Sequence, residues 1–285
     1  MVNGTGFSLL QERYRNLTDI IYENSDVRSR DMLFMRRLDL VIMVLLGYIA
    51  FAVLGPKLMA RYKPLELKWP MFAYNVAIAI WSLWMFLELL INSRISNYNY
   101  ICDPYTLSYE PSELRIVNAM WHYWLSKGVE FLDTGFMVFK KKNSQITFLH
   151  VYHHTFMFPF LFFGVLFGPC GQAIVGPIMN TFVHVVMYSY YAMSLFPALQ
   201  PYLWWKKYLT QLQLVQFIIL LTLTANGLYS NCAYPHSMGY IQLAFMVSLI
   251  ILFSNFYLQA YIKRHRKSHS SPSRSQVVSD EKKEL

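Results

Sequence analysis

Histidines spaced for one face of a helix are the residues of this sequence best suited to chemistry. His150, His153 and His154 stand at positions i, i+3 and i+4, so a helix places all three imidazoles on one stripe. A neutral imidazole can act as a base, a nucleophile or a metal ligand. The spacing therefore predicts a histidine-centred site.

Three further segments carry polar side chains at helical spacing. The intervals within each set are mostly three or four residues, which confines the set to one broad helix face. The sets are Lys127, Glu130, Asp133 and Thr134; Asn180, His184, Tyr188 and Tyr191; and Thr210, Gln213 and Gln216. Because such groups are unfavourable in an apolar segment unless they are paired or wetted, we expect these faces to surround one site.

The elements that must position these residues are strongly apolar. Of the 285 residues, 55% are hydrophobic, 17% are aromatic and only 14% are charged, which is atypical of a soluble domain. Apolar runs that each approach the roughly 20 residues needed to cross a bilayer cover 38–58, 71–92, 117–139, 148–168, 172–195, 207–228 and 238–262. Backbone groups in lipid must be satisfied within their own segment, and no alternating barrel pattern is present. The sequence thus predicts an all-α integral membrane protein, a bundle of about seven transmembrane helices.

Basic residues between the runs predict the orientation. Lys and Arg follow the first, third and seventh runs and precede the sixth, and the positive-inside rule assigns these loops to the cytosol. Four arginines before the first run balance the basic residues after it, so this run alone does not set its own direction. The charges of the later loops set the orientation. We therefore expect a luminal arm over 1–37, a seven-span catalytic domain over 38–262 and a basic cytosolic tail without a core over 263–285. All four polar sets are then expected in the cytosol-facing half of the bilayer.

The ends of the chain carry weaker signals. Asn3 and Asn16 begin glycosylation sequons in the predicted luminal arm, and no cleavable signal peptide is visible. Lys282 and Lys283 near the end of the tail resemble a dilysine retrieval signal of endoplasmic reticulum membrane proteins. Much of the net charge of +9 lies on basic residues that flank the membrane spans, where it sets topology and contacts anionic lipid. We therefore expect no nucleic acid as a partner.

The three cysteines all fall in predicted luminal segments, where disulfides can form. Cys102 and Cys232 are the expected pair, because both lie in loops long enough to meet. Cys170 lies in a tight Gly-Pro-Cys-Gly turn. Spacing alone does not set connectivity, so three free thiols stay an alternative.

The polar sets resemble, in order, spacing and transmembrane setting, the four signature boxes of the very-long-chain fatty acid elongases. The matching strings are Lys127-Gly-Val-Glu-Phe-Leu-Asp-Thr134, Gln145-Ile-Thr-Phe-Leu-His-Val-Tyr-His-His154, Asn180-Thr-Phe-Val-His-Val-Val-Met-Tyr-Ser-Tyr-Tyr191 and Thr210-Gln-Leu-Gln-Leu-Val-Gln216. The resemblance implies a condensing enzyme of the endoplasmic reticulum. Such an enzyme joins a long-chain acyl-CoA to malonyl-CoA and releases carbon dioxide and CoA to give a 3-ketoacyl-CoA.

The resemblance also implies an acyl tunnel within the bundle, acyl-CoA and malonyl-CoA as substrates, and no tightly bound cofactor or metal. The expected partners are membrane lipid and the ketoacyl-CoA reductase, dehydratase and enoyl reductase of the elongation cycle.

Candidate roles follow from the chemistry of condensation. Because no cysteine is predicted near the cytosol, an imidazole is the candidate acyl carrier. We expect His153, at the centre of the stripe, to be the nucleophile, with His184 as its closest partner. The other candidate catalytic residues are His150, His154, Asn180, Lys127, Glu130, Asp133 and Gln213, of which His154, Asn180 or Gln213 can stabilise an enolate oxygen. Exchange of roles within the stripe, or direct attack of the enolate on bound acyl-CoA, stays open.

Substrate binding is assigned to a second group of residues. Tyr188, Tyr191, Thr210 and Gln216 are expected to face the substrates, and a basic rim of Lys140, Lys141, Lys142, Lys206 and Lys207 is expected to contact the phosphates of CoA.

Two other classes of protein share parts of the pattern. Membrane di-iron desaturases and hydroxylases also contain HxxHH, but they need about eight histidine ligands. This chain has 8 histidines in all, two of them, His265 and His269, in the tail, and His122 and His236 are poorly placed. A seven-span receptor would share the external amino terminus, but the short cytosolic loops and the buried polar sets argue against it.

Overall fold

The structure is a computed structural model that describes residues 6–232 and 236–263, and the regular elements within those ranges are all helical. The longer helices are α1 (Gly6–Glu23), α2 (Leu38–Met59), α3 (Lys68–Ile95), α4 (Pro111–Val129), α5 (Phe131–Phe139), α6 (Phe148–Phe167), α7 (Val175–Ser194), α8 (Lys206–Tyr229) and α9 (His236–Tyr257). Short turns are η1 (Asn143–Gln145), η2 (Gly171–Ile174), η3 (Pro197–Tyr202) and the π-helical η4 (Leu258–Lys263). The all-α prediction is confirmed.

Membrane-spanning character is clear for five helices. By length and apolarity α2, α3, α6, α8 and α9 with its following turn qualify as spans. The third predicted run is split between α4 and the 9-residue α5, and neither these helices nor α7 meet the combined length and apolarity of a span. The protein is an all-α integral membrane protein, and the count of seven spans stays a prediction.

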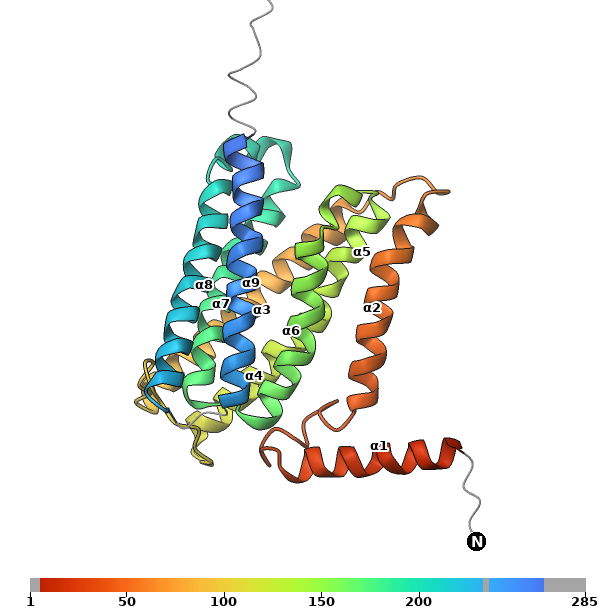
Figure 1. The fold of residues 1–285 in the computed structure, drawn as a ribbon. Helices are drawn as coiled ribbons and strands as arrows, with labels where there is room; N and C mark the ends of the chain where they lie inside the picture. The colour runs from red at the N-terminus through yellow and green to blue at the C-terminus, as the bar shows by residue number, and fades with distance from the viewer. Residues whose placement is uncertain (1–5, 233–235, 264–285) are drawn as a thin grey trace, which may run out of the picture.

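Six helices form a closed ring around the polar residues. In order around the ring, α3 packs on α4, α4 on α6, α6 on α9, α9 on α8, α8 on α7 and α7 on α3. The contact between α6 and α9 is the smallest of these. Figure 1 shows α2 outside the ring, where it packs on α5 and α6, and α1 lying across the ends of the other helices.

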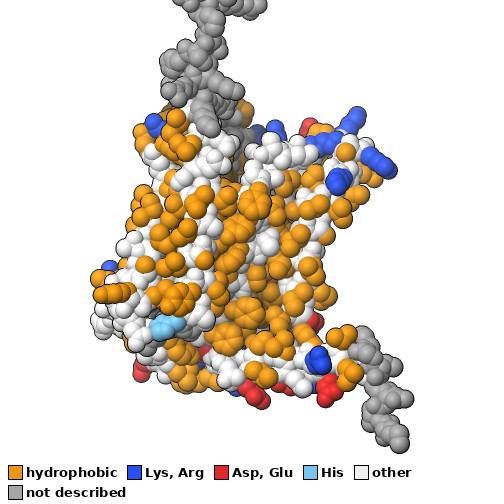
Figure 2. Space-filling view, in the orientation of Figure 1, with side chains coloured by type: hydrophobic (Ala, Val, Ile, Leu, Met, Phe, Trp, Pro, Cys, Tyr) orange, Lys and Arg blue, Asp and Glu red, His pale blue; other side chains and the backbone are white. Residues whose placement is uncertain are grey.

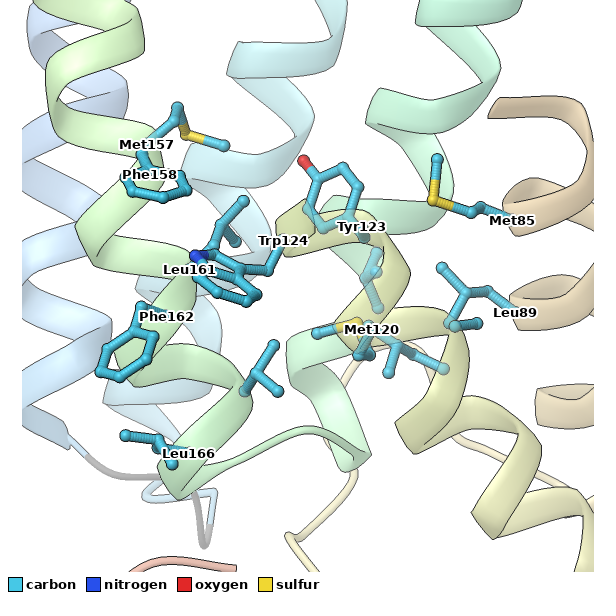
Figure 3. Close-up of a cluster of buried hydrophobic side chains, with 14 of the residues drawn as sticks. Met85, Leu89, Met120, Tyr123, Trp124, Met157, Phe158, Leu161, Phe162 and Leu166 are labelled. Atoms are coloured by element: carbon cyan, nitrogen blue, oxygen red, sulfur yellow. The ribbon is translucent and has the colours of Figure 1, made fainter. Parts of the chain in front are cut away.

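The apolar core lies largely between α4 and α6. Trp124 of α4 stacks on Phe158 and tilts against Phe162, both with ring centroids 5.5 Å away. Figure 3 shows Met157, Phe158, Leu161 and Phe162 on the side of α6 that faces Trp124. In lipid such contacts hold helices together by close packing more than by transfer from water.

A disulfide and a tight loop close the end of the bundle nearest α1. Cys102 and Cys232 are joined by a disulfide, as expected from their loops. Gly171 has φ +66°, and a Cβ there would lie 2.7 Å from Pro104 O, so this crossing of two loops requires glycine. The loop before α4 is thereby held against the loop before α7.

A buried ion pair ties the amino-terminal arm to the same end. Arg28 donates to Asp26 Oδ2 over 2.6 Å and to Ser108 O over 2.8 Å, and both charged side chains are buried. The free Cys170 lies 3.3 Å from the same guanidinium. Residues 24–37 are therefore part of the folded bundle, although the sequence indicated only an arm.

Charged side chains separate along the bundle. In the view of Figure 2, Lys and Arg gather mainly at the end that holds the α5–α6 loop, Asp and Glu lie mostly near α1, and a hydrophobic belt lies between them. Asn16 is exposed on α1. Asn3, His265, His269, Lys282 and Lys283 lie outside the described residues.

Loss of the disulfide should destabilise the protein. Cys102 and Cys232 are separated by 130 residues, and opening so long a loop should lower the free energy of unfolding by about 2–4 kcal/mol. Thermal unfolding of purified Cys102→Ser measures the loss. The double variant Cys102→Ser/Cys232→Ser should match the single one, because the same bond is already absent. Peptide mapping without reduction that finds both wild-type cysteines alkylated would contradict the pairing.

Candidate active site

A buried ion pair marks the junction of α4 and α5. Glu130 is the C-cap residue of α4. Asp133 N donates to Glu130 O in an i to i+3 pattern, so the backbone forms one tighter turn between α4 and α5. Lys127 Nζ donates to Glu130 Oε1 over 2.7 Å, and their side chains are only 2% and 1% exposed. Spacing of three residues predicted that they share a face, and the structure pairs them.

Helix α7 brings two further groups onto this pair. Asn180 Oδ1 accepts from Lys127 Nζ over 3.1 Å and from the hydroxyl of Tyr123 over 2.8 Å. His184 Nδ1 lies 3.3 Å from Glu130 Oε1 and 3.4 Å from Lys127 Nζ. A polar network that joins α4 to α7 thus surrounds the pair through Glu130 Oε1, whereas Glu130 Oε2 is buried without a hydrogen-bond partner among the described residues.

The start of α6 is positioned by its own cap. Thr147 accepts from His150 N through its side chain, so the helix begins just before the histidine stripe. His150 Nε2 then lies 2.7 Å from Thr134 Oγ1, and the hydroxyl of Tyr48 lies 3.2 Å from the same oxygen. His150 is therefore tied to α5 and α2 and has a defined orientation.

His153 occupies a different position from its neighbours. It lines a cavity of ≈ 60 Å³ inside the ring together with Tyr123, Asn180 and Gln216, and no other histidine of the described residues lines it. Neither ring nitrogen of His153 has a hydrogen-bond partner among the described residues. The imidazole nearest to it is that of His154, with centroids 5.2 Å apart. No hydrogen bond or ring contact joins His153 to His184 among the described residues, so their pairing stays a prediction.

The remaining residues of the polar sets fall into two groups. Tyr188 donates to Asp133 Oδ2 over 2.6 Å, whereas Tyr191 is 39% exposed and contacts the rings of Tyr188 and Tyr190. On α8, the residue of the polar set in the cavity wall is Gln216, whose Oε1 is buried without a partner among the described residues.

Thr210 and Gln213 lie outside the cavity wall. Thr210 is buried one to two turns before Gln216, and Gln213 Nε2 donates to Met187 Sδ over 3.6 Å. Of the third polar set on α8, only Gln216 therefore reaches the cavity beside His153.

The predicted basic rim lies at the ends of helices. Lys140, Lys141 and Lys142 follow α5, and Lys206 and Lys207 begin α8. Lys141 has φ +54°, and its ammonium group donates to Ala60 O over 3.1 Å. This ammonium is therefore already hydrogen-bonded within the protein. Lys207 lies over the ring of Tyr208, 4.8 Å from its centroid, and Lys142, Lys206 and Lys207 are exposed.

The polar network lies deeper than expected. Asn180 comes five residues after α7 begins at the end of the bundle nearest α1, and His184 is near the helix midpoint. The network therefore reaches the middle of the bundle, although the histidine stripe stays near the basic end. Sequence reasoning also missed two tyrosines. Tyr123 stands one turn before Lys127 on the same face, which was a usable signal, whereas Tyr48 lies in an otherwise apolar span.

No cluster of three or more His, Cys, Asp or Glu side chains is arranged to hold a metal ion within residues 6–232 and 236–263. His122 packs among Trp81, Trp84 and Trp121, and His236 is exposed at the end nearest α1. Neither belongs to the network.

Comparison with known proteins gives a consistent picture. A family model described as the GNS1/SUR4 (ELO) family matches residues 33–269. A protein of Tachysurus fulvidraco named very long chain fatty acid elongase 5 is 41% identical over 232 residues, covering 81% of this chain and 79% of that protein. Very long chain fatty acid elongase 4 of Mus musculus is 45% identical over 215 residues (75% and 69%), and the Homo sapiens protein of that name is 44% identical over 215 residues (75% and 68%).

The buried ion pair should be essential for stability. Glu130→Gln leaves the Lys127 ammonium without its carboxylate, so the free energy of unfolding should fall by about 3–5 kcal/mol. Glu88→Gln is the matched control, because Glu88 pairs with Arg115 whose side chain is 62% exposed, and such a pair contributes about 1 kcal/mol or less. Thermal unfolding of both variants in detergent makes the comparison. Equal losses would mean that the pair at Glu130 is no more important than a peripheral one.

Proposed function

The chain belongs to the GNS1/SUR4 (ELO) family of fatty acid elongases, and on this premise we propose that it catalyses the condensation step of elongation. The substrates are a long-chain acyl-CoA and malonyl-CoA, and the products are a 3-ketoacyl-CoA, carbon dioxide and CoA.

The observation that carries the proposal is the position of His153. Its imidazole faces a cavity, it has no hydrogen bond to another described residue, and four polar side chains, those of Tyr123, Asn180, Gln216 and Gln242, line the same space. Asn180 has its carbonyl occupied by Tyr123 and Lys127, while its Nδ2 group has no acceptor among the described residues. A free nucleophile beside a free amide donor is the arrangement that acyl transfer requires.

The chemistry proceeds in two steps. A ring nitrogen of neutral His153 attacks the thioester carbonyl carbon, the carbon–sulfur bond breaks, and CoA leaves as a thiolate that takes a proton from solvent. Malonyl-CoA then loses carbon dioxide, and the electron pair of the broken bond remains as an enolate. The enolate carbon attacks the acyl carbon, the acyl–nitrogen bond breaks, and the neutral imidazole is regenerated.

The network around Lys127 and Glu130 has a positioning role in this proposal. It fixes Asn180 through its carbonyl oxygen, so that the amide nitrogen is the end free to stabilise the oxyanion or the enolate. His150, tied to Thr134, and His154, next to His153, are the neighbouring bases. The nearby basic rim is the candidate contact for the CoA phosphates, with Lys141 less available because it bonds to Ala60.

Acylation of His153 is testable by intact-mass analysis. Acyl-CoA alone should release CoA and add the mass of the acyl group to the purified protein, because the first step does not need malonyl-CoA. His153→Ala should abolish both the adduct and condensation. His236→Ala, an exposed histidine at the other end, should retain both. An adduct that survives His153→Ala would assign the acyl carrier elsewhere, and condensation without any adduct would favour direct attack on acyl-CoA.

We also infer the location and orientation. The retrieval-like ending and the elongase relatives favour the endoplasmic reticulum membrane, and the basic end of the bundle favours a cytosolic opening with a luminal α1. The enzyme would then meet CoA substrates where they are dissolved.

Protease protection in sealed microsomes tests this orientation. Added protease should remove a tag at the carboxyl terminus and spare one at the amino terminus. Microsomes opened with detergent are the control and should lose both tags. Protection of the carboxyl-terminal tag in sealed vesicles would invert the site.

A further inference from the structure

The cavity beside His153 is too small for a long acyl chain. At ≈ 60 Å³ it is far below the roughly 300–1,000 Å³ typical of ligand pockets. Past the polar residues its walls are apolar, with Leu161, Gly164 and Leu220 among them. A chain held at His153 must therefore continue beyond this space.

The straight path along the ring axis meets a closed end. A second cavity, of ≈ 40 Å³, adjoins the first and shares Gly176 and Leu220 with it. Gln172 seals it by donating to Ile101 O over 2.9 Å and to Leu223 O over 3.1 Å. A Cβ at Gly227 would lie 2.6 Å from Gln172 Oε1, so helix α8 already touches this amide.

The seal at the closed end is also covalent, because Cys232 of the disulfide lines the second cavity. Moving an acyl chain through it would separate hydrogen-bonded groups without replacing their partners, which is unfavourable.

A lateral path from the interior cavity to the lipid-facing surface is blocked by an aromatic side chain, that of Phe160. A groove of ≈ 690 Å³ lies between α6 and α9, lined by Pro159, Phe163, Met238 and Ile241 among others. Phe160 lines both this groove and the interior cavity. Figures 1 and 2 show α6 and α9 on the face turned to the viewer, with hydrophobic side chains over both.

The seam between these helices is the weakest part of the ring. Among the neighbouring helix pairs of the six-helix ring, α6 and α9 have the smallest contact, and aromatic side chains make most of it. Phe156 stacks on Phe245 with centroids 3.8 Å apart, and Tyr152 tilts against the same Phe245 ring at 5.7 Å. One polar contact, between Tyr152 OH and Ser248 Oγ over 2.8 Å, lies toward the basic end.

We propose that the methyl end of a long acyl chain held at His153 leaves the interior past Phe160 and lies in the groove between α6 and α9. The proposal rests on the proposed function, because it takes the acyl group to be the occupant. An acyl chain is as apolar as the lipid it would displace, and the groove is lined mainly by apolar side chains, with Asn24 and Ser237 as its polar residues. A change in the rotamer of Phe160, which is only partly buried, opens the passage. The length of the chain is then not limited by the enclosed volume.

Photo-crosslinking of the wild-type protein tests the route directly. Acyl-CoAs with a diazirine at the methyl end, in a series of increasing chain length, are added without malonyl-CoA, and the labelled peptides are mapped. Short chains should label interior residues such as Leu161 and Leu220, and long chains should label Phe163, Met238 or Ile241. Long-chain label on Leu223 or Thr224 would place the chain in the straight path and overturn the proposal, as would label scattered over the lipid-facing surface.

A pair of matched variants gives the second measurement. Phe160→Trp should narrow the passage and lower the yield of the longest products relative to the shortest by about tenfold or more. Phe182→Trp, an exposed phenylalanine of α7 that lines neither space, should leave the product distribution unchanged. An unchanged distribution in Phe160→Trp would overturn the lateral route while leaving the condensation intact. Absence of condensation in the wild type at every chain length would instead count against the proposed function.

Discussion

The buried pair of Lys127 and Glu130 is the constraint on which the rest of the site depends. Two charges inside an apolar bundle are tolerated only if they neutralise each other and their remaining hydrogen-bonding capacity is used. That requirement draws Asn180 and His184 of α7 to the junction of α4 and α5. It thereby fixes the distance between two helices that are otherwise held by apolar contacts, and it sets the direction of the Asn180 amide.

The two ends of the bundle are built for different purposes. The end nearest α1 is closed by a disulfide, a buried Asp26–Arg28 pair and a loop crossing that only Gly171 permits. The opposite end carries exposed lysines and begins α6 with the histidine stripe. Rigidity at one end and charge at the other suit a protein that receives a large anionic substrate from one side. Under the proposed function, His153 would then lie between the open basic end and the closed end.

The ring is held unevenly, and this unevenness has a physical basis. Hydrogen bonds join α4 to α7 across the interior of the ring, and close aromatic packing joins the neighbouring helices α4 and α6. The α6–α9 seam relies mainly on ring contacts, in which Phe156 of α6 and Tyr152 of α6 meet Phe245 of α9. In a membrane, parting such a seam replaces ring contacts by lipid contacts of similar apolarity, whereas parting the polar joints leaves groups unsatisfied. Opening is therefore easiest between α6 and α9.

The sequence by itself determined the class of protein and the contents of the site. Long apolar runs are recognised locally, because each must satisfy its own backbone in lipid, and the polar sets follow from helical periodicity. The confirmed all-α fold was accessible in this way, the elongase family came from the resemblance of the polar sets to its signature boxes, and loop length favoured the Cys102–Cys232 pair that the structure contains. Spacing within one helix says nothing about which neighbouring helix a side chain meets.

Only the tertiary structure decided that His153 faces the cavity, that His184 joins the Lys127–Glu130 pair, and that Tyr48 and Tyr123 complete the network. These assignments depend on the rotation and depth of helices packed against one another. That arrangement is a property of the whole ring, and no single segment of the sequence encodes it.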